Sequence, residues 1–188
     1  MKKMFTAFFC VLLMLVGFGC GDGIPRGPSN ADLEAMTQEQ KLDGMKKMME
    51  EHPQNELTPE QKEEEARRMR QAVREGTIEH MAEFRKESYE VVGSVRIIKW
   101  GEKNVVAISE DFFTEQGPYL VLALSPYVAP RNAAEMENPK TIHLGLLKTL
   151  VGGQLFEVPK EVDLSQVKSA VVYSKPFKVI FGIGTFIP

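Results

Sequence analysis

A run of six consecutive apolar residues, Tyr119 to Leu124, constrains the fold of this chain more than any other stretch. Gly117 and Pro118 precede the run and Pro126 follows it, so residues that interrupt regular structure bound it on both sides. A helix is the competing interpretation, but this length is typical of a strand and short for a helix. Because the run is apolar at every position, it predicts a strand that is covered on both faces.

Short apolar runs separated by turn residues recur through the C-terminal part of the chain. About eight such runs within roughly 110 residues are typical of an antiparallel sandwich or small barrel. The fold prediction is therefore mainly β: an antiparallel β-sandwich or small barrel over residues 77–188, preceded by an acidic helical segment. The runs lie at residues 78–84, 89–99, 105–109, 119–124, 141–144, 154–158, 170–174 and 177–186.

Three local features refine this prediction. Residues 78–84 are either the end of the helical segment or a first edge strand, and Gly93 marks a bulge or a close backbone contact within residues 89–99. Residues 100–104 are predicted to form a hairpin loop. Residues 125–140 contain three prolines and predict a long loop, of the kind that often carries function.

Aromatic residues and charge locate the core and exclude one class of partner. Of the 16 aromatic residues, 12 lie between Phe84 and Phe186, and none lies between Phe18 and Phe84. The core is therefore expected in the C-terminal part. A formal net charge of -3 provides no basic footprint for phosphate backbones, so nucleic acid is not an expected partner.

The N-terminus has the pattern of a targeting segment. Lys2 and Lys3 precede an apolar run over residues 4–16 that is short for a membrane span and ends at small residues. Residues 17–20, Gly-Phe-Gly-Cys, resemble the lipobox of bacterial lipoproteins, whose cysteine becomes the acylated first residue. Gly17 stands where that pattern usually has Leu, Val or Ile. The alternative is cleavage by ordinary signal peptidase, which would leave a soluble secreted protein beginning at Cys20.

Cysteine usage favours the lipoprotein interpretation. If residues 1–19 are a lipoprotein signal peptide, Cys10 is removed with it and Cys20 is the one cysteine of the mature chain. Acylation of Cys20 explains a cysteine without an intramolecular partner, and membrane lipid is the partner expected through it. We expect a lipid-anchored protein of the bacterial cell envelope, on the periplasmic face of the outer membrane or on the cell surface.

Residues 20–30 are predicted to be a flexible tether because they are rich in Gly and Pro. Residues 31–76 form the charged helical segment. Thr37 with Gln40, and Thr58 with Gln61, fit capping boxes, and Gly76 marks a helix end.

The helical segment is strongly charged, with a thin apolar stripe. Residues 30–75 carry 12 acidic and 8 basic residues, net -4, and Glu63 and Glu64 are each placed four residues before Arg67 and Arg68. The stripe consists of Ala66, Met69 and Val73. The segment is therefore predicted to be a solvated stalk or a helical pair laid on a partner, such as another envelope protein.

Methionine and histidine residues on one predicted helix suggest either a copper site or an apolar docking face. Met45, Met48, Met49 and His52 share one helical face, and thioether and imidazole groups suit Cu(I). Methionine is also an ordinary filler of an amphipathic face, so a docking face is the preferred interpretation. His80 and His143 have no second ligand at metal-site spacing, and no metal or cofactor is expected.

A series of short motifs runs in order through about residues 84–186. The motifs include Gly93-Ser94-Val95, Asp111-Phe112, Gly117-Pro118, Leu124-Ser125, His143-Leu144-Gly145, Gly153-Gln154-Leu155-Phe156 and Tyr173-Ser174-Lys175-Pro176-Phe177. In this order they resemble the electron-transfer DM-thirteen domain. The resemblance implies a secreted or surface-exposed β-domain, often beside cytochrome-type domains, whose proposed redox role depends on one cysteine.

Two positions depart from the family pattern. Tyr173-Ser174 stands where the family has Trp-Cys, and Tyr119 stands where it has Asp after Gly-Pro. A serine hydroxyl does not ionise near neutral pH and cannot replace a thiolate without a strong base. Ser174 is therefore interpreted as a small structural side chain at the family-cysteine position. The sequence offers no catalytic triad, carboxylate pair or phosphate loop, so no catalytic residues are assigned.

Three functions are compatible with the sequence. The preferred one is a binding or interaction module rather than an enzyme. The second is electron transfer through a bound haem or metal, with ligands among Met45, Met48, Met49, His52, His80 and His143. The third is a structural envelope component whose helices dock on another protein.

Overall fold

A computed structural model describes residues 23–53 and 57–186. The elements are helices α1 (Asn30–Ala35), α2 (Gln38–Glu51), α3 (Pro59–Glu75) and α4 (Ala133–Met136), the 3-10 helix η1 (Leu164–Gln166), and strands β1 (Thr77–Lys86), β2 (Val91–Val92), β3 (Ser94–Trp100), β4 (Lys103–Ile108), β5 (Phe113–Thr114), β6 (Leu120–Ser125), β7 (Ile142–Leu146), β8 (Gln154–Val158), β9 (Ser169–Ser174) and β10 (Val179–Thr185).

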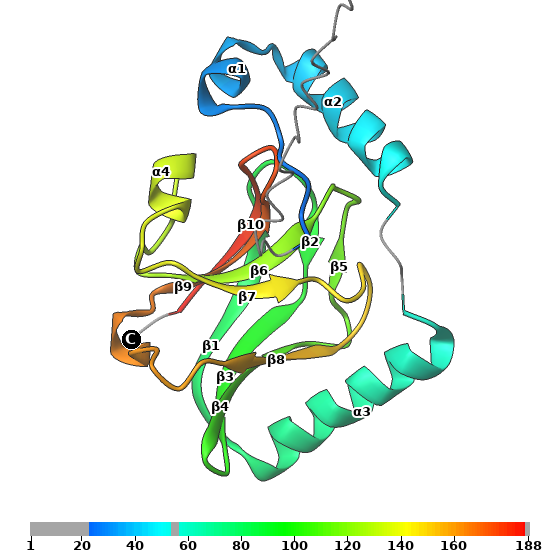
Figure 1. The fold of residues 1–188 in the computed structure, drawn as a ribbon. Helices are drawn as coiled ribbons and strands as arrows, with labels where there is room; N and C mark the ends of the chain where they lie inside the picture. Colours follow the sequence, from blue (N-terminus) through cyan, green and yellow to red (C-terminus); the bar gives the residue numbers. More distant parts are fainter. Residues whose placement is uncertain (1–22, 54–56, 187–188) are drawn as a thin grey trace, which may run out of the picture.

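Eight of these strands form one antiparallel sheet that curls into a nearly closed barrel (Figure 1). The strand order is β7-β6-β9-β10-β1-β3-β4-β8, and the two edge strands, β7 and β8, approach each other. The short strands β2 and β5 pair separately. This architecture confirms the mainly β prediction in its small-barrel form.

The predicted strands are present, with three corrections to their details. Residues 78–84 belong to β1, which is not an edge strand, because it lies between β10 and β3. The hairpin between β3 and β4 turns at Gly101 and Glu102 alone, which is shorter than the predicted loop of residues 100–104. The loop of residues 125–140 contains the short helix α4.

The predicted close backbone contact at Gly93 is confirmed. Its φ is +105°, and a Cβ placed there would lie 2.8 Å from the Cα of Phe112. Only glycine adopts this conformation at low cost.

The continuous apolar run in β6 is explained by burial on both faces. Leu120, Leu122 and Leu124 belong to the cluster that fills the barrel, while Val121 and Ala123 belong to a second cluster on its outer face. The loop that carries α4 contributes the buried Met136 to this outer cluster. All six residues of β6 are therefore buried, and the strand begins one residue later than the predicted run of residues 119–124, because Tyr119 lies in the preceding turn with a φ of +49°.

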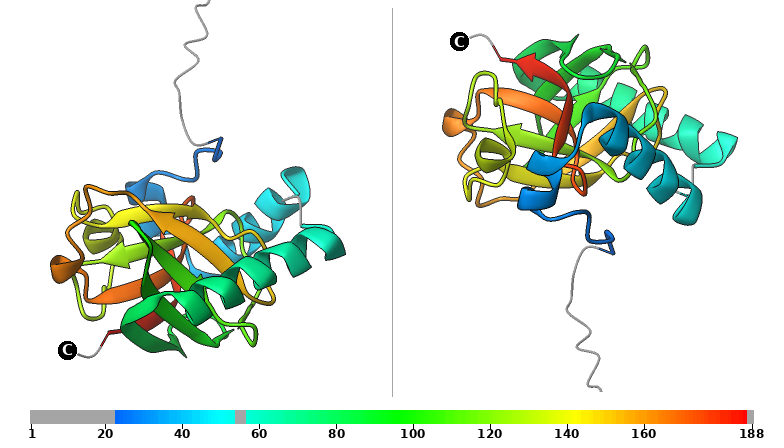
Figure 2. Two further views of the ribbon diagram at one scale, coloured as in Figure 1. Left: turned by 90° about the horizontal axis from the view of Figure 1, so that it is seen from below. Right: turned by 90° about the horizontal axis from the view of Figure 1, so that it is seen from above.

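The helices pack on the barrel, which corrects the prediction of a stalk. Met69 and Ala72 of α3 are buried against the outer face of β3, β4 and β8, where they contact Ile98, Val105, Ala107 and Leu155. Helices α1 and α2 lie across one end of the barrel (Figures 1 and 2), and contribute Leu33 and Met45 to the barrel core. The helical segment has no separate core because the barrel supplies the apolar surface that it covers.

The helices begin and end at the predicted capping residues, but the ion pairs differ from the predicted ones. Capping boxes form at Thr37 and Thr58, and Gly76 caps the end of α3. Arg67 and Arg68 pair with the glutamates three residues earlier, at 2.7 and 3.2 Å, rather than four residues earlier. Arg70 joins Glu63 at 2.6 Å and reaches the barrel at Glu110, at 2.9 Å.

Polar side chains join α3 and the loop before β8 to the edge of β8. The Lys148 ammonium donates to Glu65 of α3 and to the carbonyl of Leu155, both at 2.7 Å. The buried amide of Gln154 accepts from the backbone N–H of Lys148 and donates to the carbonyl of Thr149. At the edge of β8, the carbonyl and the N–H of Leu155 are therefore bonded by Lys148 and Glu65, which disfavours pairing with another strand there.

Among residues 23–53 and 57–186, no helix is long and apolar enough to cross a membrane.

Replacing Met69 by Ala tests the docking of α3. We expect a loss of about 2 to 3 kcal/mol in the free energy of unfolding, because a buried side chain is removed without compensation. Met81→Ala is the matched control, since Met81 is 53% exposed on β1 and should change stability by no more than about 0.5 kcal/mol. Urea unfolding measures both, and equal effects would contradict the packing of α3 on the barrel.

Candidate functional site

Ser174, the predicted family-cysteine position, lies at the C-terminal end of β9 and is completely buried. Its Cα is paired with Leu120 of β6 and Val179 of β10. The Ser174 hydroxyl donates to the carbonyl oxygen of Pro118 at 2.8 Å. Because a backbone carbonyl cannot accept the proton as a base, this contact fixes the strand end and does not activate a nucleophile.

The turn that follows Ser174 is covered by α1 and α2. Phe177, in the turn between β9 and β10, is buried in the barrel core together with Leu33 and Met45. A Cβ placed at Gly44 would lie 2.9 Å from Cε1 of Phe177, so this glycine allows α2 to approach the ring. Glycine inside a helix is ordinarily destabilising, whereas here Gly44 has a packing role.

Tyr89 and Phe181 complete this end of the barrel. Their rings are stacked with centroids 4.3 Å apart, and the Tyr89 hydroxyl donates to the sulfur of Met45 at 3.8 Å. Burial, followed by the charge of Glu115, raises the pKa of Tyr89. The closed end is therefore an aromatic and methionine-rich contact between the helices and the barrel.

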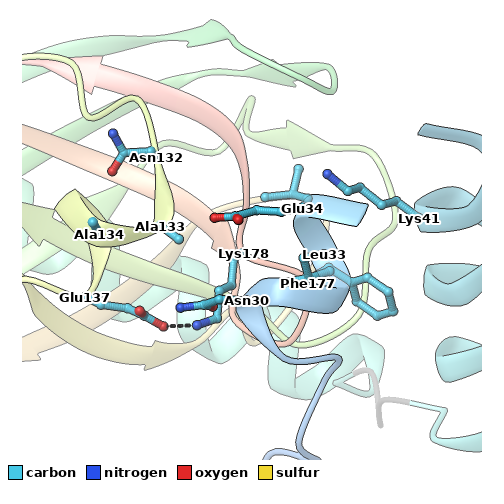
Figure 3. Close-up of a pocket in the computed structure, with 11 residues that line it drawn as sticks. Asn30, Leu33, Glu34, Lys41, Asn132, Ala133, Ala134, Glu137, Phe177 and Lys178 are labelled. Atoms are coloured by element: carbon cyan, nitrogen blue, oxygen red, sulfur yellow. Dashed lines mark hydrogen bonds and ion pairs between the residues drawn. The ribbon is translucent and has the colours of Figure 1, made fainter. Parts of the chain in front are cut away.

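A cleft of about 470 Å³ remains between α1, the start of α2, α4 and the β9–β10 turn (Figure 3). The Lys178 ammonium and the Glu137 carboxylate form an ion pair across it. Glu34 of α1 and Lys41 of α2 approach it from the other side (Figure 3). Its lining consists of Asn30, Leu33, Glu34, Lys41, Asn132, Ala133, Ala134, Glu137, Phe177, Lys178 and Val179.

A second hollow of about 520 Å³ adjoins the cleft. The two share Lys41, Asn132, Lys178 and Val179, so they adjoin across these residues, and together they are called the depression. The second hollow adds the polar groups of Gln38, Ser88 and Arg131. The whole depression combines an apolar floor with a rim of amides and charged side chains of both signs, which suits recognition of a small amphipathic molecule.

The candidate metal ligands do not come together. Met45 and Met48 pack against the barrel core, while His52 caps the end of α2. His80, on β1, lies beside Phe186 with ring centroids 5.7 Å apart. His143 lies on β7, with Nε2 at 3.2 Å from the carbonyl oxygen of Met136. In the described part of the chain, no three His, Cys, Asp or Glu residues are grouped so that they could hold a metal ion.

The methionine face of α2 therefore docks on the chain's own barrel. Met45 and Met48 have the role of apolar fillers, and the surface that they cover belongs to the same molecule. Cys20, the predicted lipidation site, lies outside the described residues.

Tyr173, one of the departures from the family pattern, has a buried environment that the sequence did not predict. Its side chain is buried under the outer cluster, and its hydroxyl has no hydrogen-bond partner among the described residues. Burial, followed by the charge of Glu137, raises the pKa of Tyr173 well above its ordinary value. No local sequence pattern predicts this buried hydroxyl, because the residues around it come from β7, β10 and the loop of α4 as well as from residue 24.

Replacing Tyr173 by Phe tests this unpartnered hydroxyl. We expect the free energy of unfolding at pH 7 to rise by about 1 kcal/mol, because a buried polar group without a partner is removed. The folded protein holds the Tyr173 proton more tightly than the unfolded chain. The free energy of unfolding of the parent therefore falls as the pH rises above about 10, where the unfolded chain loses this proton first, so the variant should be less sensitive to alkaline pH.

Tyr127→Phe provides the control for Tyr173→Phe. The Tyr127 hydroxyl accepts a hydrogen bond from the amide of Asn138 at 3.0 Å, so its removal should cost about 1 kcal/mol. Urea unfolding at pH 7 and above pH 10 measures both variants. A loss of stability in Tyr173→Phe equal to that of the control would contradict an unpartnered hydroxyl.

Comparison with models of protein families matches residues 83–185 to the family described as Electron transfer DM13. Comparisons with curated proteins and with solved structures gave no match. The match begins in β1 and extends to the end of β10, so it covers nearly the whole barrel and leaves out α1, α2 and α3. The matched residues contain no cysteine, because the two cysteines of the chain are Cys10 and Cys20. Since the match covers more than half of the chain, this protein belongs to the Electron transfer DM13 family.

Proposed function

We propose that this protein is a lipid-anchored component of the bacterial cell envelope whose barrel acts as a binding module. Acylated Cys20 provides the anchor, and an envelope protein or a small molecule in the periplasm is the partner. The depression between α1, α2, α4 and the β9–β10 turn is the binding site. The Gly17 to Cys20 pattern supports the anchor, and the geometry of the depression supports the binding role.

The depression is the observation on which the binding role depends. Leu33, Phe177 and Val179 provide apolar surface, while Lys41 and Asn132 provide polar groups next to it. Among the described residues, Lys41 and Arg131 form no ion pair, and neither do Glu34 and Glu87 of the same lining. An amphipathic molecule with a charged end would contact both the apolar and the charged surface.

Binding is a better account of this site than catalysis. No His, Cys or Ser lines the cleft of α1 and α4. The adjoining hollow contains Ser88 but no histidine that could act as its base. At the proposed family-cysteine position, the Ser174 hydroxyl is already engaged by the carbonyl of Pro118. The arrangement therefore contains groups that recognise and orient a ligand, and no nucleophile paired with a base.

Binding of anilinonaphthalene sulfonate, an aromatic probe with an anionic end, tests the site. We expect saturable binding to one site, measured by fluorescence titration. Ala134→Trp should abolish it, because Ala134 is exposed on α4 and its replacement would fill the cleft. Ala129→Trp, at an exposed position of the same loop outside the lining, should leave binding unchanged. Unsaturable binding, or equal binding by both variants, would overturn the assignment.

The family's description favours electron transfer as the second candidate function. In this chain such a role would require a cofactor held without a thiol in the barrel. The sulfur and imidazole groups considered from sequence lie on α2, β1 and β7 in separate surroundings. The proposal that Ser174 occupies the family-cysteine position provides a direct test of this candidate.

Ser174→Cys restores a thiol at the proposed position. We expect the parent protein, expressed in the periplasm, to be colourless and free of stoichiometric copper or iron. If Ser174→Cys gains redox activity or cofactor binding that the parent lacks, the parent is a scaffold that has lost its reactive group. Ser169→Cys is the matched control, because Ser169 is equally buried at the other end of β9. Absorption spectra and metal analysis are the measurements. A Soret band or stoichiometric metal in the parent would instead favour electron transfer.

A further inference from the structure

Three exposed apolar side chains lie in one row across the small sheet of β2 and β5 (Figure 1). Val92 of β2 is paired with Phe113 of β5, and Phe113 forms a bridge on its other side with Val151. Residues that lie directly opposite each other in an antiparallel pair point to the same face of the sheet. The three residues are therefore neighbours on one face, with exposed fractions of 43%, 42% and 56% in the order Val92, Phe113 and Val151.

The backbone holds this row in place on the barrel. The N–H of Thr114 donates to the carbonyl of Leu150 at 3.0 Å, and the N–H of Gly152 donates to the carbonyl of Phe112 at 2.9 Å. Phe112 and Thr114, the sequence neighbours of Phe113, are buried on the opposite face. Phe113 therefore cannot turn inward unless β5 loses these backbone hydrogen bonds.

Phe113 is the one exposed aromatic residue in the described part of the chain, where every other aromatic residue is buried or half-buried. Apolar side chains that are exposed side by side, with polar residues around them, mark interaction sites, and aromatic residues carry much of the binding energy at protein interfaces. None of the three residues of the row lines the depression. The row is therefore a surface separate from the proposed ligand site.

Carboxylates flank the row on both sides. Asp111 is exposed two residues before Phe113, and Glu115 is exposed two residues after it. The N–H of Glu90, next to Val92 in β2, donates to the Glu115 carboxylate at 2.7 Å, which keeps this charge beside the row. Among the described residues, neither Asp111 nor Glu115 forms an ion pair.

These two charges limit the kind of partner. In a symmetric dimer, the same patch of both copies would meet, so the carboxylates of Asp111 and Glu115 would be brought together and would repel each other. Anionic lipid headgroups would be repelled in the same way. A protein surface that carries cationic side chains around an apolar one would instead match both the charge and the apolar row.

We propose that the Phe113 patch docks a segment of another protein in which lysine or arginine residues flank apolar side chains. The Phe113 patch consists of Val92, Phe113 and Val151, with Asp111 and Glu115 beside them. Phe113 provides the apolar contact, and the two carboxylates select and orient the cationic groups. Because three side chains expose a small area, the contact belongs to the class of transient encounters. It is independent of ligand binding in the depression, so either proposal can fail without the other.

Fluorescence anisotropy with a designed peptide tests the Phe113 patch. Full-length protein in a neutral detergent is titrated into the fluorescein-labelled peptide Lys-Leu-Lys-Phe-Lys-Leu-Lys. We expect saturable binding that weakens as the salt concentration is raised. A peptide with Glu in place of Lys, and one with Ser in place of Leu and Phe, should both bind more weakly. Equal binding of the three peptides, or no saturable binding of the first, would overturn the proposal.

Replacing the apolar residues locates the contact. Phe113→Ser should weaken binding of the lysine peptide by about tenfold or more, because an aromatic residue at the centre of the contact is lost. Val151→Ser, at the end of the row, should weaken it in the same direction. Met81→Ser is the matched control, since Met81 is similarly exposed but lies on β1. Urea unfolding verifies that each variant is folded, and equal weakening by Met81→Ser would show that the patch is not the site.

Neutralising the carboxylates tests the role of charge. Asp111→Asn combined with Glu115→Gln should weaken binding of the lysine peptide by about fivefold. The side-chain oxygen of Gln at position 115 can still accept the hydrogen bond from Glu90, so the local structure is kept. Glu79→Gln combined with Glu83→Gln removes the same charge from exposed positions of β1 and should have no effect. If the two double variants weaken binding equally, the overall charge of the chain attracts the peptide and the assignment fails.

Sedimentation equilibrium in the same detergent tests a second copy of this chain as the occupant. We expect the mass of one protomer for the parent and for Phe113→Ser. A dimer that Phe113→Ser dissociates would show that the patch joins two copies, and would overturn the proposed partner.

Discussion

Burial of β6 and β9 on both faces is the constraint on which the rest of this structure depends. Their inward side chains fill the barrel, and their outward side chains, such as Val121 and Tyr173, are also apolar or aromatic and require a cover. The cover comes from the loop of α4 and from the first described residues of the chain. Because burial of apolar surface is the main favourable contribution to folding, these remote segments are needed for the barrel itself.

The same requirement explains why a depression exists at one end of the barrel. Helices α1 and α2 cover the aromatic contact of Phe177, Tyr89 and Phe181, while α4 covers β6 and β9. The two covers come from different parts of the chain and meet above Lys178. They leave a space between them that is lined by polar rims and an apolar floor. The candidate ligand site therefore lies where helices α1 and α2 and the loop of α4, which cover different parts of the barrel, come next to each other.

Helix α3 serves a different purpose on the other side of the barrel. Its apolar stripe covers β3, β4 and β8, and Glu65 satisfies Lys148 and the free edge of β8. The family match leaves this helix out, although in this protein the helix packs on β3, β4 and β8. The acidic helical segment is thus integral to this version of the domain, even though its charge suggests a solvated stalk.

The local elements could be predicted from the residues alone. Strand β6, the capping boxes at Thr37 and Thr58, and the close contact at Gly93 follow from chain-local chemistry: an apolar run, side chains that bond nearby N–H groups, and a backbone angle that suits glycine. The order of motifs also indicated the family to which the chain belongs. Tertiary structure alone decided that β1 is central, that the helices dock on the barrel, and that Gly44 faces Phe177. It also decided the cleft and the unpartnered hydroxyl of Tyr173, because these depend on contacts between residues far apart in the chain, which local periodicity and composition do not encode.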